Sequence, residues 1–374
     1  MHAPSRWIRP VFALLAVPVA VTVGAQAPAP PPEKWFDDIA VNVFVSSAYL
    51  YNPNRPATGA TSYRVFDYND NSFSLDVAEL VVQVAPSEPN DVGFRVDFAA
   101  GNSIPQISKT QDQAATRFDV QQAFASYIAP IGSGLRLDVG KYMTHMGYEV
   151  IEGYDGYNEN YSRSVLFGYA IPFTHTGIKA TYAFASRVSA MVEVVKGWDL
   201  LRDNNGARSV GAQLTITPVA PLTVLVNWIG GAEIEADNHT RRDVFDLVVI
   251  LKPTKALTLG LNADYGIERG TSSVDPGSDA TWKGIAGYAS VAVTPRFAIG
   301  LRGETFSDDD GLRLGTGTRT TLSEATLTPV YKFSDHVLLR AEVRFDRASQ
   351  PILANRTTLS ERQTTVGANV VLVY

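Results

Sequence analysis

The stretch Val337-Leu338-Leu339-Arg340-Ala341-Glu342-Val343-Arg344-Phe345-Asp346 sorts its side chains by simple alternation. Its odd-numbered positions are all apolar, whereas the even-numbered positions from 340 to 346 are all charged. Successive side chains of a β-strand point to opposite faces, while a helix would scatter the four charges around its circumference. The stretch therefore predicts a strand with one face against an apolar medium and the other against water or opposite charges.

The same alternation recurs along most of the chain and predicts about sixteen strands. The length of each is close to what a tilted strand needs to cross a bilayer, about 9–11 residues. No stretch beyond the N-terminal region has the pattern of an amphipathic helix. The expected strands are 39–50, 71–84, 92–101, 118–129, 135–144, 176–185, 188–198, 208–217, 222–232, 242–252, 257–268, 281–293, 296–306, 320–333, 336–348 and 362–374.

The expected connections between these strands alternate strictly between short and long. Outer-membrane barrels have this asymmetry, with short periplasmic turns and longer outer loops. A soluble sandwich has no reason to keep it. The long connections are rich in Gly, Asn, Asp, Ser and Thr, and they are 51–70, 102–117, 145–165, 199–207, 233–241, 269–280, 307–319 and 349–361.

These apolar faces need a partner, and no helices are expected to cover them. In hydrocarbon every backbone polar group must be paired, so only helices and closed barrels span membranes. Lipid outside and water inside satisfy both faces of every strand. We therefore predict an all-β fold, a transmembrane antiparallel β-barrel wide enough to leave an aqueous channel.

Composition is compatible with this barrel and excludes some partners. The 374 residues are 45% hydrophobic and 19% charged, which suits a soluble protein as well as a barrel with a polar interior. The net charge of -6 argues against a nucleic-acid partner. Because the chain has no cysteine, disulfides and thiolate metal sites are excluded.

The N-terminus has the features of a secretory signal peptide. Arg6 and Arg9 precede an apolar run from Val11 to Val23, and small residues lead to a cleavage site after Ala25. An anchoring helix is the alternative, but the run is short and interrupted by proline. We expect a signal peptide at 1–25, a Pro-rich linker at 26–38 and the barrel at 39–374, placed in the outer membrane.

The C-terminus alternates in the same way and ends on an aromatic residue. Val366, Ala368, Val370, Leu372 and Tyr374 share one face of the last strand. This pattern resembles the C-terminal signal of outer-membrane barrels. The resemblance implies outer-membrane lipid and the barrel-assembly machinery as partners.

A specific block lies between Asp138 and Tyr182. It contains Gly140-Lys141-Tyr142, Gly147-Tyr148-Glu149, Ser162-Arg163-Ser164 and Pro172-Phe173-Thr174-His175-Thr176-Gly177. With these motifs the chain resembles the OmpL-like family of β-barrel porins. The resemblance implies a water-filled channel for passive diffusion of small hydrophilic solutes or ions, and is compatible with a homo-oligomer.

Residues 145–175 form the chemically most distinctive connection. In general porins a long loop folds inward and narrows the pore, and the resemblance suggests the same here. The alternative is an outer loop packed on itself by Tyr154, Tyr157 and Tyr161. The candidate pore-lining and constriction residues are Tyr142, His145, Glu149, Asn158, Asn160, Arg163 and His175.

The polar strand faces supply a second set of candidates, charges that point into the lumen. Two roles are open for them: pairs on adjacent strands brace the wall, or they set ion selectivity. The lumen charges are Arg95, Asp97, Arg136, Asp138, Asp264, Arg302, Glu304, Arg340, Glu342, Arg344 and Asp346.

Other functions have weaker support. His145 and Glu149 offer two metal ligands without a third, so we expect no metal and no other cofactor. The chain has no G-x-S-x-G elbow for a nucleophilic serine, so we expect no catalytic residue and no enzyme. A structural or adhesive outer-membrane barrel with a plugged lumen stays open as the alternative to a porin.

Overall fold

Sixteen antiparallel strands close into a barrel in the structure, a computed structural model that describes residues 38–111 and 114–374. The barrel strands are β1 (Ala40–Tyr51), β2 (Ser72–Val84), β3 (Val92–Ala100), β4 (Phe118–Ala129), β5 (Leu135–Met143), β6 (Thr174–Ala185), β7 (Val188–Val195), β8 (Ser209–Val219), β9 (Leu222–Ala232), β10 (Arg241–Thr254), β11 (Leu257–Glu268), β12 (Ala280–Ala292), β13 (Phe297–Asp308), β14 (Thr320–Lys332), β15 (Val337–Ala348) and β18 (Arg362–Val373). Each pairs with its neighbours along the chain, and β18 pairs with both β15 and β1 to complete the ring.

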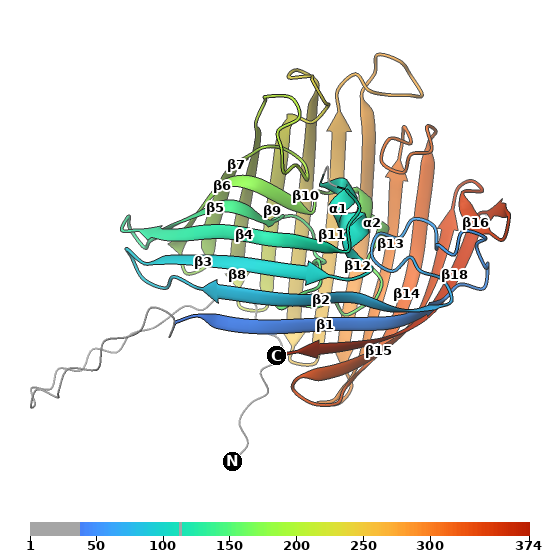
Figure 1. Cartoon of the computed structure of the whole chain (residues 1–374), viewed down its shortest axis with the longest axis horizontal. Coiled ribbons are helices and arrows are strands. Elements are labelled where there is room, and N and C mark those ends of the chain that lie inside the picture. Colours follow the sequence, from blue (N-terminus) through green and yellow to red (C-terminus); the bar gives the residue numbers. More distant parts are fainter. Residues whose placement is uncertain (1–37, 112–113) are drawn as a thin grey trace, which may run out of the picture.

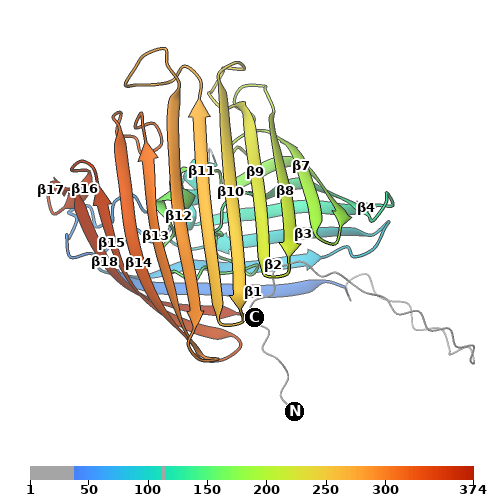
Figure 2. The same ribbon diagram turned by 180° about the vertical axis from the view of Figure 1, so that it is seen from behind.

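The strand prediction from alternation is confirmed. Every observed end lies within three residues of the expected one, and the largest difference is at β7, which ends at Val195. Short turns and long loops alternate as expected. Figure 2 shows the long loops at one end of strands β8 to β14 and the short turns at the other, while Figure 1 shows β1 to β4 crossing in front of them at a steep tilt.

The faces of β15 are also as predicted. Arg340, Glu342 and Arg344 are buried inside the barrel, whereas Phe345 on the opposite face is 55% exposed. Large apolar side chains are exposed on nearly every strand, which leaves an apolar outer surface suited to lipid. Examples are Phe73, Val92, Phe118, Ile178, Val192, Phe245, Ile285 and Val366.

The seam that closes the barrel uses the last residue of the chain. The backbone N–H of Tyr374 donates to the carbonyl of Val43 at 2.8 Å, and the N–H of Val43 donates back at 2.8 Å. The ring of Tyr374 lies beside His336, with ring centroids 4.9 Å apart. The terminal aromatic therefore extends the ladder between β18 and β1.

The expectation of no helix beyond the N-terminal region is wrong in two places. The helices α1 (Ile104–Thr110) and α2 (Val165–Tyr169) are too short for an apolar period to be recognised in the sequence. Figure 1 shows both beside the inner ends of β3 and β4, in front of β11 to β13. A small hairpin, β16 (Leu353–Asn355) with β17 (Thr358–Ser360), forms in the last long loop.

Among the described residues, no helix is both long and apolar enough to cross a membrane. The predicted signal peptide and nearly all of the Pro-rich linker lie outside the described residues.

Candidate functional site

The longest connection of the barrel, residues 144–173 between β5 and β6, folds into the lumen. We call it the inner loop. Tyr161, Phe167 and Phe173 are all at most 4% exposed, and α2 packs against β12 and β13. The alternative of an outer loop packed on itself is therefore wrong, because Tyr161 lies under the guanidinium of Arg340 on the wall, 5.8 Å from its ring centroid.

The first anchor of the inner loop is an ion pair between Glu149 and Arg302 of β13. Nη1 of Arg302 lies 2.7 Å from Oε1 of Glu149, and both side chains are buried. The other carboxylate oxygen accepts hydrogen bonds from the backbone N–H and the hydroxyl of Ser164, at 2.7 and 2.5 Å. Glu149 thus folds the loop on itself and ties it to the wall.

The second anchor joins Glu152 to Arg340 of β15. Nη1 of Arg340 lies 2.5 Å from Oε1 of Glu152 and also donates to the carbonyl of Asn158 at 2.8 Å. Arg163 lies 3.4 Å from the same carboxylate. Burial alone would raise the pKa of Glu152, but the charges of Arg163 and Arg340 lower that pKa below its ordinary value. The carboxylate is therefore held in its charged form.

Two wall carboxylates bind the backbone of the inner loop. Glu342 of β15 accepts hydrogen bonds from the N–H groups of Tyr161 and Ser162, at 2.7 and 3.1 Å. Glu304 of β13 accepts from the N–H groups that begin α2, those of residues 165 and 166, at 2.5 and 2.9 Å. A carboxylate at a helix start satisfies N–H groups that have no partner in the helix.

Further bonds attach the inner loop to other parts of the ring. Backbone N–H groups of the loop donate to side chains of β10, β11 and β2. The side-chain amide of one loop residue donates to a hydroxyl of β14. The pairs are Gly147 with Asp246 at 3.2 Å, Tyr148 with Asn262 at 3.0 Å, Tyr154 with Glu79 at 2.6 Å, and Asn160 Nδ2 with Thr328 at 2.8 Å. The loop therefore crosses the lumen and is bonded around much of its circumference.

The predicted constriction residues divide into two groups. Glu149, Asn158, Asn160 and Arg163 lie in the part of the inner loop that is bound to the far wall, and all four are buried. Asn158 closes the loop on itself, because its side chain exchanges hydrogen bonds with the backbone of Val150 at 2.9 and 3.0 Å.

The other three, Tyr142, His145 and His175, gather where the inner loop leaves β5 and enters β6. The ring of Tyr142 packs edge-on against Phe124, with centroids 6.4 Å apart. The two histidine rings are 6.0 Å apart and both approach Glu193 of β7. The considered pairing of His145 with Glu149 does not form, because Glu149 is bound to Arg302.

The predicted lumen charges form two kinds of contact. Arg302, Glu304, Arg340 and Glu342 hold the inner loop, and Arg344 donates to the carbonyl of Arg163 at 2.5 Å. The others pair two residues apart along one strand or lie in a polar cluster. These contacts are Arg95 with Asp97 at 2.8 Å, Arg136 with Asp138 at 2.9 Å, Arg344 with Asp346 at 2.7 Å, and Asp264 with Asn262 at 3.4 Å.

Several site residues escaped the sequence analysis, among them Glu79 and Asp246, which bind the loop backbone, and the following three. Glu152 sits in an aperiodic loop where nothing distinguishes it from a solvated acid. Glu193 occupies a routine polar position of a strand. Arg64, in the loop between β1 and β2, pairs with Asp346 at 2.8 Å across 282 residues of sequence, and no local signal marks such a contact.

A closed barrel with an apolar exterior, a polar interior and a long loop inside the ring is the architecture of an outer-membrane porin. The chain belongs to the family described as "Putative beta-barrel porin-2, OmpL-like", whose model matches residues 38–373. The predicted family, fold and porin function are thereby confirmed. No curated protein sequence matches the chain.

Solved structures share this fold at low sequence identity. The outer membrane channel DcaP of Acinetobacter baumannii is 11% identical, with 90% of this chain and 97% of that chain covered and a TM-score of 0.62. An anion-selective porin from Comamonas acidovorans is 12% identical, with 90% and 99% covered and a TM-score of 0.62. OmpF of Salmonella typhi, in complex with daunomycin, is 12% identical, with 91% and 99% covered and a TM-score of 0.58.

Proposed function

We propose that this porin passes small hydrophilic solutes and ions by passive diffusion, and that the inner loop forms its constriction. The observation that carries the proposal is the attachment of residues 144–173 to strands on the opposite side of the ring. A loop bonded to both sides of the lumen divides its cross-section. Its charged groups then act on a permeating ion at short range, where screening is weakest.

We further propose export through the signal peptide at 1–25, insertion by the barrel-assembly machinery, and a homo-oligomeric state in the membrane. OmpT of Vibrio cholerae, with a TM-score of 0.58 to this chain, is described in a trimer form and supports the oligomeric state. We assign the protein no catalytic step, because the charged side chains of the inner loop are engaged in holding it.

Single-channel recording of the purified, folded protein in planar bilayers tests the channel. The wild type is expected to conduct, and removal of residues 150–160 is expected to raise the conductance of each channel. Because this deletion also removes Glu152, the ion-pair partner of both Arg340 and Arg163, it is combined with Arg340→Gln and Arg163→Gln so that neither cation stays buried alone.

The matched control is Asp275→Lys in the outer loop between β11 and β12, where the side chain only accepts from Ser278 at 2.6 Å. It is expected to change the conductance much less. Equal conductance of the deletion variant and the wild type would reject the constriction.

One observation favours the alternative of a structural barrel with a plugged lumen. Phe66, from the loop between β1 and β2, packs on Phe167 and Phe173 of the inner loop, with ring centroids 6.0 and 5.6 Å apart. Such an apolar cluster inside the ring narrows the space left for water. Absence of conductance from a correctly folded wild type, together with conductance from the loop deletion, would establish the plug.

A further inference from the structure

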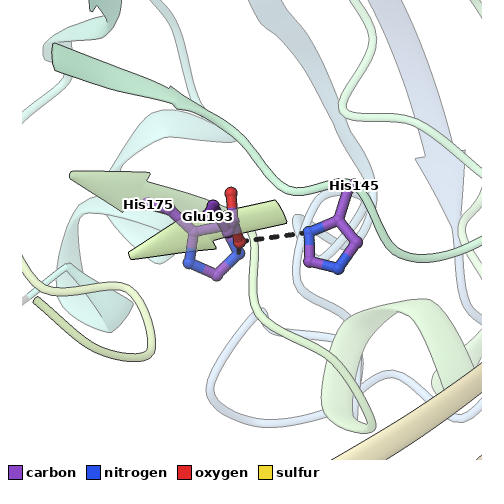
Figure 3. A group of neighbouring side chains, drawn as sticks. All are labelled: His145, His175 and Glu193. Atoms are coloured by element: carbon purple, nitrogen blue, oxygen red, sulfur yellow. Dashed lines mark ion pairs between the residues drawn. The ribbon is translucent and has the colours of Figure 1, made fainter. Parts of the chain in front are cut away.

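Three side chains with metal-binding atoms converge where the inner loop joins the wall: His145 of the loop, His175 of β6 and Glu193 of β7 (Figure 3). Nδ1 of His145 lies 3.2 Å, and Nε2 of His175 lies 3.8 Å, from Oε1 of Glu193. One ligand atom from each residue lies within 4.8 Å of the other two. The three come from separate elements, so tertiary folding alone brings them together.

The polar atoms of this cluster are buried and largely unpartnered. The side chains of His145 and Glu193 are 6% and 1% exposed. Among the described residues, Nδ1 of His145 and Oε1 of Glu193 meet only in their ion pair, and no hydrogen bond of good geometry reaches Nε2 of His145 or the second carboxylate oxygen of Glu193. Leaving such groups unsatisfied is costly. The 3.2 Å contact is an ion pair when the imidazole is protonated, and a metal ion that replaced this proton would satisfy the same nitrogen and oxygen.

His175 is oriented for the same role. Its Nδ1 faces the carbonyl of Gly197 at 3.4 Å, which directs the proton to that nitrogen and leaves the lone pair on Nε2. Metal-bound histidines generally use their second nitrogen in this way. Nε2 also lies 3.1 Å from the hydroxyl of Thr144, so this hydroxyl or a water could fill a further coordination position.

The neighbouring strand leaves room for the cluster. A Cβ atom on Gly211 of β8 would lie 2.6 Å from Oε1 of Glu193 and 3.0 Å from Cε1 of His145. No side chain at this position fits without displacing both groups. Glycine at position 211 therefore leaves Glu193 and His145 where they are, and its role is one of space because no left-handed backbone conformation is needed there.

We propose that His145, His175 and Glu193 bind a divalent transition-metal ion of the zinc type. Two imidazoles and one carboxylate suit Zn²⁺ and its neighbours, whereas Ca²⁺ and Mg²⁺ prefer sites made of oxygen. Bonds of about 2.0–2.2 Å around a tetrahedral ion place ligand atoms about 3.3–3.6 Å apart. The pair at 3.2 Å already has nearly this spacing, whereas the pair at 3.8 Å and the widest separation, up to 4.8 Å, must close on the ion.

Neighbouring charges influence how tightly the site would bind a metal ion. Lys179 of β6 lies near the cluster, with its Nζ 4.3 Å from the ring centroid of Tyr142, and opposes a cation. It is itself 3.7 Å from Asp138, which offsets part of its charge. A metal here would pin the first residues of the inner loop to β6 and β7, on the side of the ring away from the anchors at Arg302 and Arg340.

Binding is tested on the folded barrel in detergent, prepared without a histidine tag and freed of metal with a chelator. Titration calorimetry with Zn²⁺ is expected to give one equivalent bound, and Co²⁺ to give the visible absorption of a tetrahedral site. Mg²⁺ is expected to give neither. No saturable binding of Zn²⁺ or Co²⁺ by the wild type would overturn the proposal.

Variants then assign the ligands. His145→Ala, His175→Ala and Glu193→Gln are each expected to weaken Zn²⁺ binding by at least about 100-fold, more than the loss of an outer-shell partner. Gly211→Ala keeps all three ligands and is expected to weaken binding by displacing two of them. The exposed histidines supply matched controls, and His239→Ala and His336→Ala are expected to bind as the wild type does. Binding that survives all three ligand substitutions would reject this site.

Discussion

Arg340 of β15 and Glu152 of the inner loop form an ion pair with a separation of 2.5 Å, and their side chains are 0% and 3% exposed. The two residues are 188 positions apart in the sequence. Arg340 lies on the barrel wall, whereas Glu152 lies in the loop inside the barrel. Without Glu152, Arg340 would lose its ion pair inside the barrel, whereas Glu152 without Arg340 would keep Arg163 at 3.4 Å. The pair joins the inner loop to β15 and so fixes where the loop crosses the lumen.

Breaking this pair on one side is therefore expected to cost more than removing both charges. Glu152→Gln should lower the free energy of unfolding by about 3–5 kcal/mol, Arg340→Gln by less because Arg163 still pairs with Glu152, and the double variant by clearly less than their sum. Urea unfolding of the folded barrel, followed by tryptophan fluorescence, measures this. The exposed pair of Arg269 and Asp279 is the control, since Arg269→Gln should cost about 0–1 kcal/mol. Additive losses at Glu152 and Arg340 would mean that the two charges are not coupled.

The same carboxylate predicts a pH dependence. The pKa of Glu152 is lower in the folded protein than its ordinary value of 4.5. A lowered pKa contributes stability that is complete above the unfolded value and is lost as pH falls through the folded value. The stability difference between the wild type and Glu152→Gln should therefore be constant near neutral pH and shrink below about pH 4.5. Measuring the free energy of unfolding of both proteins from neutral pH to below pH 4.5 tests this prediction. A stability difference that grows on acidification would contradict a lowered pKa for Glu152.

Substitutions in the inner loop should change ion selectivity in opposite directions. Glu149→Lys places a second cation beside Arg302, so the reversal potential in a salt gradient should shift toward anions. Arg163→Glu adds an acid beside Glu152, so the shift should be toward cations. Asp275→Lys, far along an outer loop, should shift it much less. If Glu149→Lys and Arg163→Glu both matched the wild type, the inner loop would have no part in selectivity.

The two faces of β11 should differ in what they tolerate. Leu259 is 37% exposed on the outer face near the short-turn end of β11, and an arginine on the lipid face costs from about 0–1 kcal/mol near the interface to about 2–4 kcal/mol at mid-membrane. Leu259→Arg is therefore expected to fold poorly, measured by the shift in gel mobility on heating in detergent. Asn262 faces the lumen, but it binds the backbone of Tyr148, so it is a poor control. Thr258 is a better control, because it is next to Leu259 in the sequence but lies on the inner face. Thr258→Arg should fold normally. Equal folding of both variants would show that the face assignment is mistaken.

The sequence predicted the barrel closely and its interior only in part. Alternation is local, so the strands and the inward direction of residues such as Arg340 and Glu342 could be read from neighbouring residues. The path of the inner loop is set by contacts such as that between Glu149 and Arg302, which are 153 positions apart and leave no periodic signal. The same reason hid Glu193: two histidines 30 positions apart meet it only after β5, β6 and β7 have paired.

Tyr374 gives the sharpest test of barrel closure. Its backbone makes two hydrogen bonds with Val43, and its ring is 75% exposed beside His336. Deleting it removes the last rung between β18 and β1 together with an aromatic anchor at the membrane interface. The deletion variant should fold more slowly into lipid vesicles and reach a lower folded fraction on gels. Tyr374→Phe keeps the backbone bonds and the ring, so it should fold like the wild type, while Tyr374→Ala keeps the bonds alone and should fall between them. Folding of Tyr374→Ala at the wild-type rate would assign the effect to the backbone rung, and normal folding of the deletion variant would show that closure does not depend on the terminal residue.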